Sequence, residues 1–134
     1  MMSDAYHDEV HAAHALLAEK SFPPWQTVAA VVLTESGQRQ LALNIDSRLP
    51  RAGVCAEPIA VGMAVAQDPQ DPVVFVAAVN LTGRVIAPCG PCRELLTDYG
   101  PDAQVAVPVS DGFETIPLRD LHPFVHRREE RRQV

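Results

Sequence analysis

The apolar positions near the start of the chain recur at the spacing of one helical face. Tyr6, Val10, Ala13 and Leu17 follow one another at intervals of three or four residues, and side chains at that spacing lie along one side of an α-helix. Charged residues such as Asp8 occupy the intervening positions. The pattern predicts a helix over residues 4–20.

Five later segments have the pattern of β-strands. The first is a continuous run of apolar and β-branched residues, which is typical of a central strand buried on both faces. A turn at Gly37 separates it from the second, so we expect these two to form a hairpin. A tight turn from Ser110 to Gly112 predicts an antiparallel pair near the C-terminus. The five predicted strands are residues 27–33, 39–45, 73–79, 104–109 and 113–116.

Two further helices are predicted, and each begins at a segment that contains cysteine. Residues 55–66 are rich in alanine, and Pro58 is compatible with a helix only in its first turn. Residues 88–99 form the other helix, which Gly100 and Pro101 end. The order of a helix, a hairpin and then β/α units predicts an α/β fold, a three-layer α/β/α sandwich around a five-stranded mixed sheet.

Length and composition fit a single domain over residues 1–134, with residues 1–3 and 127–134 as peripheral tails. The chain has 134 residues, 47% of them hydrophobic, which suffices for one substantial core. The first residues lack a secretory signal pattern and no apolar run approaches a membrane span, so we expect a cytoplasmic protein without membrane contact. The net charge of -6 disfavours nucleic acid as a partner.

Three cysteines and one glutamate form the candidate catalytic group. The sequence reads Cys-Ala-Glu at positions 55–57 and Pro-Cys-Gly-Pro-Cys at positions 88–92. Thiolates select zinc, and three protein ligands leave the fourth position for water, as in catalytic zinc sites. We therefore expect Cys55, Cys89 and Cys92 to hold one zinc ion per chain. Glu57 is the expected proton carrier beside it.

Two other interpretations of the cysteines are open. The segment Cys89-Gly90-Pro91-Cys92 matches the thioredoxin dithiol motif, which would make the chain a thiol–disulfide redox protein. That interpretation leaves Cys55 and Glu57 unexplained, and Pro88 stands where thioredoxins have Trp. Three inert core cysteines would have no reason to fall at ligand spacing beside a carboxylate. The zinc interpretation is favoured over both.

These motifs resemble those of the zinc-dependent cytidine deaminase superfamily, in which [HC]-x-E is followed by P-C-x-x-C. With Cys55 as the first ligand, the sequence resembles the all-cysteine branch of the family, which acts on free nucleosides and on blasticidin S. The resemblance implies hydrolysis of a C–N bond in a cyclic amidine, so that cytidine or deoxycytidine becomes the uracil nucleoside and ammonia is released. It also implies a role in pyrimidine salvage and a homotetramer. Pro58, where the family usually has Arg, favours the blasticidin S deaminase branch.

The resemblance further implies which residues contact the substrate. Asn44 and Asp46 stand at the distance from the first cysteine at which the family has its sugar-binding N-x-E segment; an Asn/Asp turn after a strand is the alternative. Backbone groups at Ala56 and Pro88 are expected at the edge of the base. Independently of the resemblance, Arg93 adds a positive charge near the ligands and is expected to tune the zinc, with a surface ion pair to Glu94 or Asp98 as an equal alternative.

The sequence does not assign the aromatic residue that would stack on the base in the substrate site. Cytidine deaminases place a Phe before their Val-Gly-Ala-Ala strand, and the corresponding region around Gln26 has none. The candidates are Trp25, Phe124 and an aromatic residue of a neighbouring subunit. The arginine-rich segment after residue 126 mixes both charges, which favours a solvated extension or a subunit contact.

Overall fold

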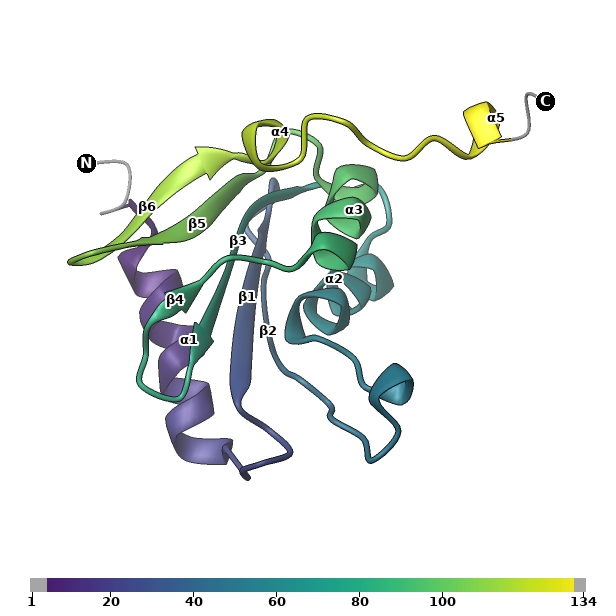
Figure 1. The fold of residues 1–134 in the computed structure, drawn as a ribbon. Helices are drawn as coiled ribbons and strands as arrows, with labels where there is room; N and C mark the ends of the chain where they lie inside the picture. Colours follow the sequence, from purple (N-terminus) through teal and green to yellow (C-terminus); the bar gives the residue numbers. More distant parts are fainter. Residues whose placement is uncertain (1–4, 132–134) are drawn as a thin grey trace.

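A computed structural model describes residues 5–131, and in it a six-stranded mixed sheet lies between helices on both faces (Figure 1). The strand order is β2-β1-β3-β5-β6, and β4 pairs with β3 beside this path. Strands β3 and β5 are parallel, and the other pairs are antiparallel. The strands are β1 Val28–Thr34, β2 Arg39–Leu43, β3 Val73–Asn80, β4 Val85–Ile86, β5 Gln104–Val109 and β6 Gly112–Pro117. The predicted three-layer sandwich is confirmed.

The helices divide between the two faces of the sheet. Helix α1, His7–Lys20, covers one face, while α2, Ala56–Gln67, and α3, Gly90–Tyr99, lie together on the other (Figure 1). Two short helices follow β6, namely α4, Leu118–Leu121, and α5, Arg128–Arg131, and the segment between them extends past α3. Among residues 5–131, no helix combines the length and the apolar character that crossing a membrane requires.

The alternation of side chains along β1 explains its uninterrupted apolar sequence. Val31 packs in the core under α1 with Leu17 and Phe75, whereas Val32 packs in the core under α2 and α3 with Leu96. All five side chains are essentially inaccessible to solvent. A strand covered on both faces has no polar side, so the pattern is continuous rather than alternating.

Three alanines allow α2 to approach the sheet closely at its first turn. Ala56 of α2 packs on Ala30 of β1 and Ala78 of β3, and all three are buried, with Val28 and Ile86 packed against them. Larger side chains would hold the helix N-terminus away from the strands. This contact places the start of α2 at the level where β1 begins and β3 ends.

The structure refines several predicted boundaries. Helix α1 begins at His7 rather than at residue 4, and Cys55 and Cys89 are the residues that precede α2 and α3 rather than members of them. Strand β4 was not predicted, because its two residues are too few to display a pattern. Of the predicted tails, residues 127–131 include α5, while residues 1–3 and 132–134 lie outside the described residues.

Candidate metal centre and substrate pocket

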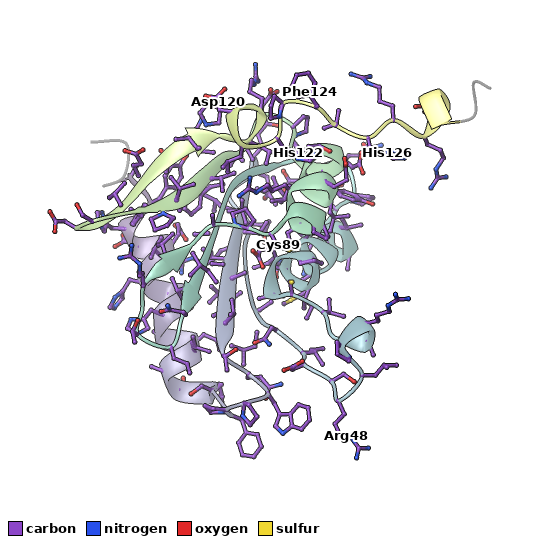
Figure 2. The ribbon with its side chains drawn as sticks, viewed as in Figure 1. Arg48, Cys89, Asp120, His122, Phe124 and His126 are labelled. Carbon is purple, nitrogen blue, oxygen red and sulfur yellow. The ribbon has the colours of Figure 1, made fainter. Side chains whose placement is uncertain are left out.

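The three cysteines are brought together by the N-terminal ends of two helices. Cys55 immediately precedes α2, Cys89 immediately precedes α3, and Cys92 lies in the first turn of α3. Their sulfur atoms all lie within 4.8 Å of one another. The Sγ atom of Cys89 is 3.9 Å from that of Cys55 and 3.3 Å from that of Cys92. Figure 2 shows Cys89 where the adjoining ends of α2 and α3 meet.

This arrangement fits a tetrahedral zinc ion. Zinc–sulfur bonds of about 2.3 Å at tetrahedral angles separate the sulfurs by about 3.8 Å, which is close to the observed spacing. Cys92 is buried, and burial together with the nearby Glu57 carboxylate raises the pKa of its thiol. Burial also raises the pKa of Cys55. A divalent cation reverses this effect, because it stabilises the thiolates directly.

Glu57 lies beside the cysteine cluster without being part of it. Its side chain projects from the first turn of α2 and is only 5% exposed, and this burial raises the pKa of its carboxyl group above the usual value. Among the described residues, the close ligand cluster comprises the three cysteines alone. A buried carboxyl group whose pKa is raised holds its proton more readily than an exposed one, which suits a general acid–base.

A cavity of about 370 Å³ opens directly onto this group. Its walls are mainly aliphatic and bear two carboxylates, and among residues 5–131 no Lys, Arg, His or aromatic side chain lines it. Its rim includes the two-residue bridge in which Ile45 and Val54 exchange backbone hydrogen bonds of 2.9 and 2.8 Å. The lining residues are Val28, Asn44, Ile45, Asp46, Pro50, Gly53, Val54, Cys55, Ala56, Glu57, Ile86, Ala87 and Cys89.

Comparison with known proteins gives concordant results. The chain is 34% identical to blasticidin-S deaminase of Bacillus cereus over 75% of this chain and 77% of that protein. The cytidine deaminase structure from Burkholderia pseudomallei matches with a TM-score of 0.76 and 28% identity, covering 90% of this chain and 98% of that one. The chain belongs to the cytidine deaminase superfamily.

A second solved structure supports the same relationship for this deaminase. The cytidine deaminase from Mycobacterium leprae matches with a TM-score of 0.76 and 25% identity, and the alignment covers 89% of this chain and 98% of that chain. No protein-family model matches the sequence. The resemblance inferred from the cysteine and glutamate motifs is thus confirmed, and it extends over nearly the whole fold.

The residues expected at the sugar line the pocket of the deaminase, and both also make local bonds. The amide oxygen of Asn44 accepts hydrogen bonds from the backbone N–H groups of Thr27 and Val28, at 2.9 and 3.0 Å. Its Nδ2 donates to the carbonyl of Trp25 at 3.1 Å. The carboxylate of Asp46 accepts a hydrogen bond from the next backbone N–H. Asn44 therefore fixes the start of β1, and one Nδ2 hydrogen is left for a ligand.

The two residues expected near the ligands, Pro88 and Arg93, contact each other. Ala56 lines the pocket, whereas Pro88 is not among the lining residues, and contact of either backbone with a base stays a prediction. The Nε atom of Arg93 donates to the carbonyl of Pro88 at 2.8 Å, and Nη1 donates to the carbonyl of Leu121 at 3.2 Å. Within residues 5–131, Arg93 forms no ion pair with its acidic neighbours on α3.

Neither aromatic candidate lines the pocket within one chain. Trp25 contributes a carbonyl to the Asn44 bond but no wall, and Phe124 is 92% exposed on the C-terminal segment. The walls come instead from Val28 and Ile86, which the sequence did not single out. Ile86 stands three residues before Cys89, so its nearness to a predicted ligand in the sequence could have indicated it. Val28 reaches the site only because β1 starts there.

Proposed function

We propose that this deaminase hydrolyses a cytosine nucleoside, cytidine or deoxycytidine, to the uracil nucleoside and ammonia, with one zinc ion per chain. The observation that carries the proposal is the juxtaposition of the buried Glu57 carboxyl group with a cluster of three cysteine sulfurs at one cavity. Membership of a superfamily of hydrolytic deaminases supports it.

The proposed roles of the polar groups follow from their positions. Cys55, Cys89 and Cys92 would hold zinc, whose Lewis acidity would lower the pKa of the attacking water. Glu57 takes a proton from this water and delivers it to N3 of the cytosine ring, and the water oxygen forms a bond to C4. The proton of the resulting C4 hydroxyl then passes through the same carboxyl group to the amino group, and the C4–N bond breaks as ammonia leaves and the C4 carbonyl forms. Water is consumed and no oxidant or reductant is needed.

Backbone and amide groups are proposed to orient the nucleoside. The N–H of Ala56 lies in the first turn of α2, where backbone N–H groups have no partner within the helix. The carbonyl of Pro88 keeps a second lone pair beside its bond to Arg93. Asn44 and Asp46 line the outer part of the cavity and would contact the sugar.

The charges of the cavity favour an unphosphorylated substrate. Asp46 and Glu57 are carboxylates, and no cationic side chain of the described residues lines the cavity. A phosphate group would therefore meet carboxylates without a cationic side chain to pair with. The net charge of -6 acts in the same direction, so we propose free nucleosides rather than nucleotides or polynucleotides as substrates.

A modified cytosine nucleoside, blasticidin S, is the second candidate substrate. It is favoured by the 34% identity to blasticidin-S deaminase of Bacillus cereus and by Pro58 at the position where the family usually has Arg. Both candidate substrates would use the same cysteines and the same proton carrier. Only the part of the pocket that contacts the sugar would distinguish between them.

We also propose a cytoplasmic homotetramer that acts in pyrimidine salvage. Two residues that line the pocket have exposed apolar side chains, Ile45 at 55% and Val54 at 42%, and Leu49, nearby in the chain, is 66% exposed. We propose that these side chains form part of a contact with another subunit, because exposed apolar groups that lie together mark surfaces that meet another protein. A neighbouring subunit would also supply the aromatic wall that the pocket lacks.

Zinc content and ammonia release test the proposed function directly. The purified chain should contain about one zinc per chain, and ammonia should be released from cytidine, deoxycytidine or blasticidin S but not from cytidine monophosphate. Sedimentation of the same sample reports the oligomeric state. Insulin reduction without bound metal and without ammonia release would instead identify Cys89 and Cys92 as a redox dithiol.

A further inference from the structure

The side chain of Arg93 connects two segments that are far apart in the sequence. One branch of its guanidinium group holds the carbonyl of Pro88, and the other holds the carbonyl of Leu121, 28 residues away. Guanidinium is planar and rigid, so it fixes the separation and direction of two acceptors in a way that a lysine ammonium group does not. Pro88 leads directly into Cys89, the second expected zinc ligand.

The next residue of α3 holds the same C-terminal segment. The Oε1 atom of Glu94 accepts a hydrogen bond from the backbone N–H of His126 at 3.1 Å and lies 3.3 Å from Nε2 of His122. Figure 2 shows both histidines on the segment that runs past α3. Residues 118–126 are here named the C-terminal strap, and at its start Leu118 is buried in the core.

The placement of these bonds suggests a role for the strap in the metal centre. Cys89 has an extended backbone, with φ -71° and ψ 172°, and lies outside the regular part of α3. Residues 93 and 94, which hold the strap, follow the third ligand Cys92 directly. A displacement of the strap would therefore be transmitted to the peptide bond that orients Cys89.

We propose that Arg93 is a positioning residue that fixes Cys89 for zinc by tying the Pro88 carbonyl to the C-terminal strap. Zinc retention then depends on a segment that neither binds metal nor lines the pocket. This inference rests on the zinc assignment made above. It differs from moderation of the thiolate charge, because a charge effect needs only a cation near the sulfurs, whereas positioning needs both hydrogen bonds.

The first experiment measures the zinc dissociation constant of the full chain by competition with a chromophoric chelator. Partners that orient metal ligands typically contribute 10–100-fold to affinity, so Arg93→Gln should weaken zinc binding by about 10–100-fold. Arg93→Lys keeps the charge but cannot hold both carbonyls, so its zinc affinity should be at least about threefold weaker than that of the wild type. Arg39→Gln is the matched control, since Arg39 pairs with Glu9 on α1, away from the metal centre, and it should bind zinc as the wild type does.

Each result of this experiment bears on a defined claim. Wild-type affinity in Arg93→Lys identifies charge rather than positioning and overturns the inference, as does an unchanged affinity in Arg93→Gln or an equal loss in Arg39→Gln. A wild-type chain that binds no zinc refutes the zinc assignment itself, which is a separate outcome. If Arg93→Gln is insoluble, Glu94→Ala decides: at least a threefold faster release of zinc supports the strap, and an unchanged rate overturns it.

Hydrogen exchange supplies a readout that a merely stabilising residue would leave unchanged. Coupling between two sites is reciprocal, so zinc binding should slow amide exchange in the peptide containing residues 119–126 of the wild type. In Arg93→Gln the same peptide should exchange at equal rates with and without zinc. Zinc-independent exchange of this peptide in the wild type would contradict the proposal.

Discussion

The replacement of Glu57 by Gln separates catalysis from structure at the metal centre. Gln has nearly the same shape, so it preserves the packing of a side chain that is 5% exposed, but it does not accept and release a proton. Glu57 is not one of the three clustered ligands. We therefore expect Glu57→Gln to keep its zinc and its fold while losing most of its turnover.

The magnitude follows from the number of proton transfers assigned to this one group. General acid–base catalysis typically contributes about 10²–10⁴-fold, and Glu57 is placed to act both on the water and on the leaving amine. The loss in kcat should therefore reach about 10⁴-fold, which corresponds to about 5.4 kcal/mol of transition-state stabilisation. If Glu57 only capped the start of α2, its replacement would instead lower stability by about 1 kcal/mol and leave turnover intact.

Three measurements on one preparation distinguish these cases: zinc content, melting temperature, and ammonia release from the best substrate. Glu114→Gln serves as the control, because it is the same substitution at an exposed position on β6, and it should match the wild type in all three. If Glu57→Gln retains more than about a tenth of the wild-type turnover, the assignment of Glu57 as the proton carrier is wrong.

Three further predictions concern the metal, the backbone and an exposed carboxylate. Cys89→Ala should lose zinc and melt at a lower temperature than the wild type, and a melting temperature unaffected by chelators in the wild type would contradict a metal that stabilises the fold. Gly100→Ala should lower the free energy of unfolding in urea by about 1–3 kcal/mol, because its Cβ would lie 2.5 Å from a backbone carbonyl oxygen of β3. The Cβ of Gly62→Ala would meet no atom within 4 Å, so this variant should stabilise α2 by about 0.5–1 kcal/mol. Equal effects of the two substitutions would refute the steric argument. Hydrogen bonds from Ser36 lower the pKa of Asp71 below 3.8, so Asp71 favours folding above its unfolded pKa and loses this effect as the pH falls through its folded pKa; NMR titration should show Ser36→Ala returning the Asp71 pKa towards 3.8.

The sequence indicated the cysteine cluster more fully than the rest of the pocket. The proximity of Cys55, Cys89 and Cys92 could be predicted because zinc restricts both the type and the spacing of its ligands. The run that forms β1 was predictable because both of its faces are buried. Each of these signals depends on a physical requirement that acts on neighbouring residues in the chain.

The features that the sequence did not predict depend on contacts between distant segments. Val28 lines the pocket because the antiparallel pairing of β1 with β3 places its first residue beside the start of α2, and nothing around Val28 in the sequence indicates this. The acceptor that Arg93 finds in Leu121 is a backbone carbonyl, which every residue has. Asn44 lies at the predicted pocket, but its bonds to Thr27 and Val28 could be known only once the hairpin was in place.

The position of the cysteines at two separate helix ends has a consequence for the unfolded chain. A metal ion held by Cys55 and Cys89 joins residues 34 positions apart, so it closes a covalent-like loop that contains all of α2, β3 and β4. As long as the metal stays bound to both cysteines in the unfolded chain, the chain-entropy relation used for disulfides gives a destabilisation of the unfolded ensemble by about 4 kcal/mol. Zinc in this position would thus act as a reversible crosslink. A chelator would restore the conformational entropy of the unfolded chain, as reduction does for a disulfide-linked protein.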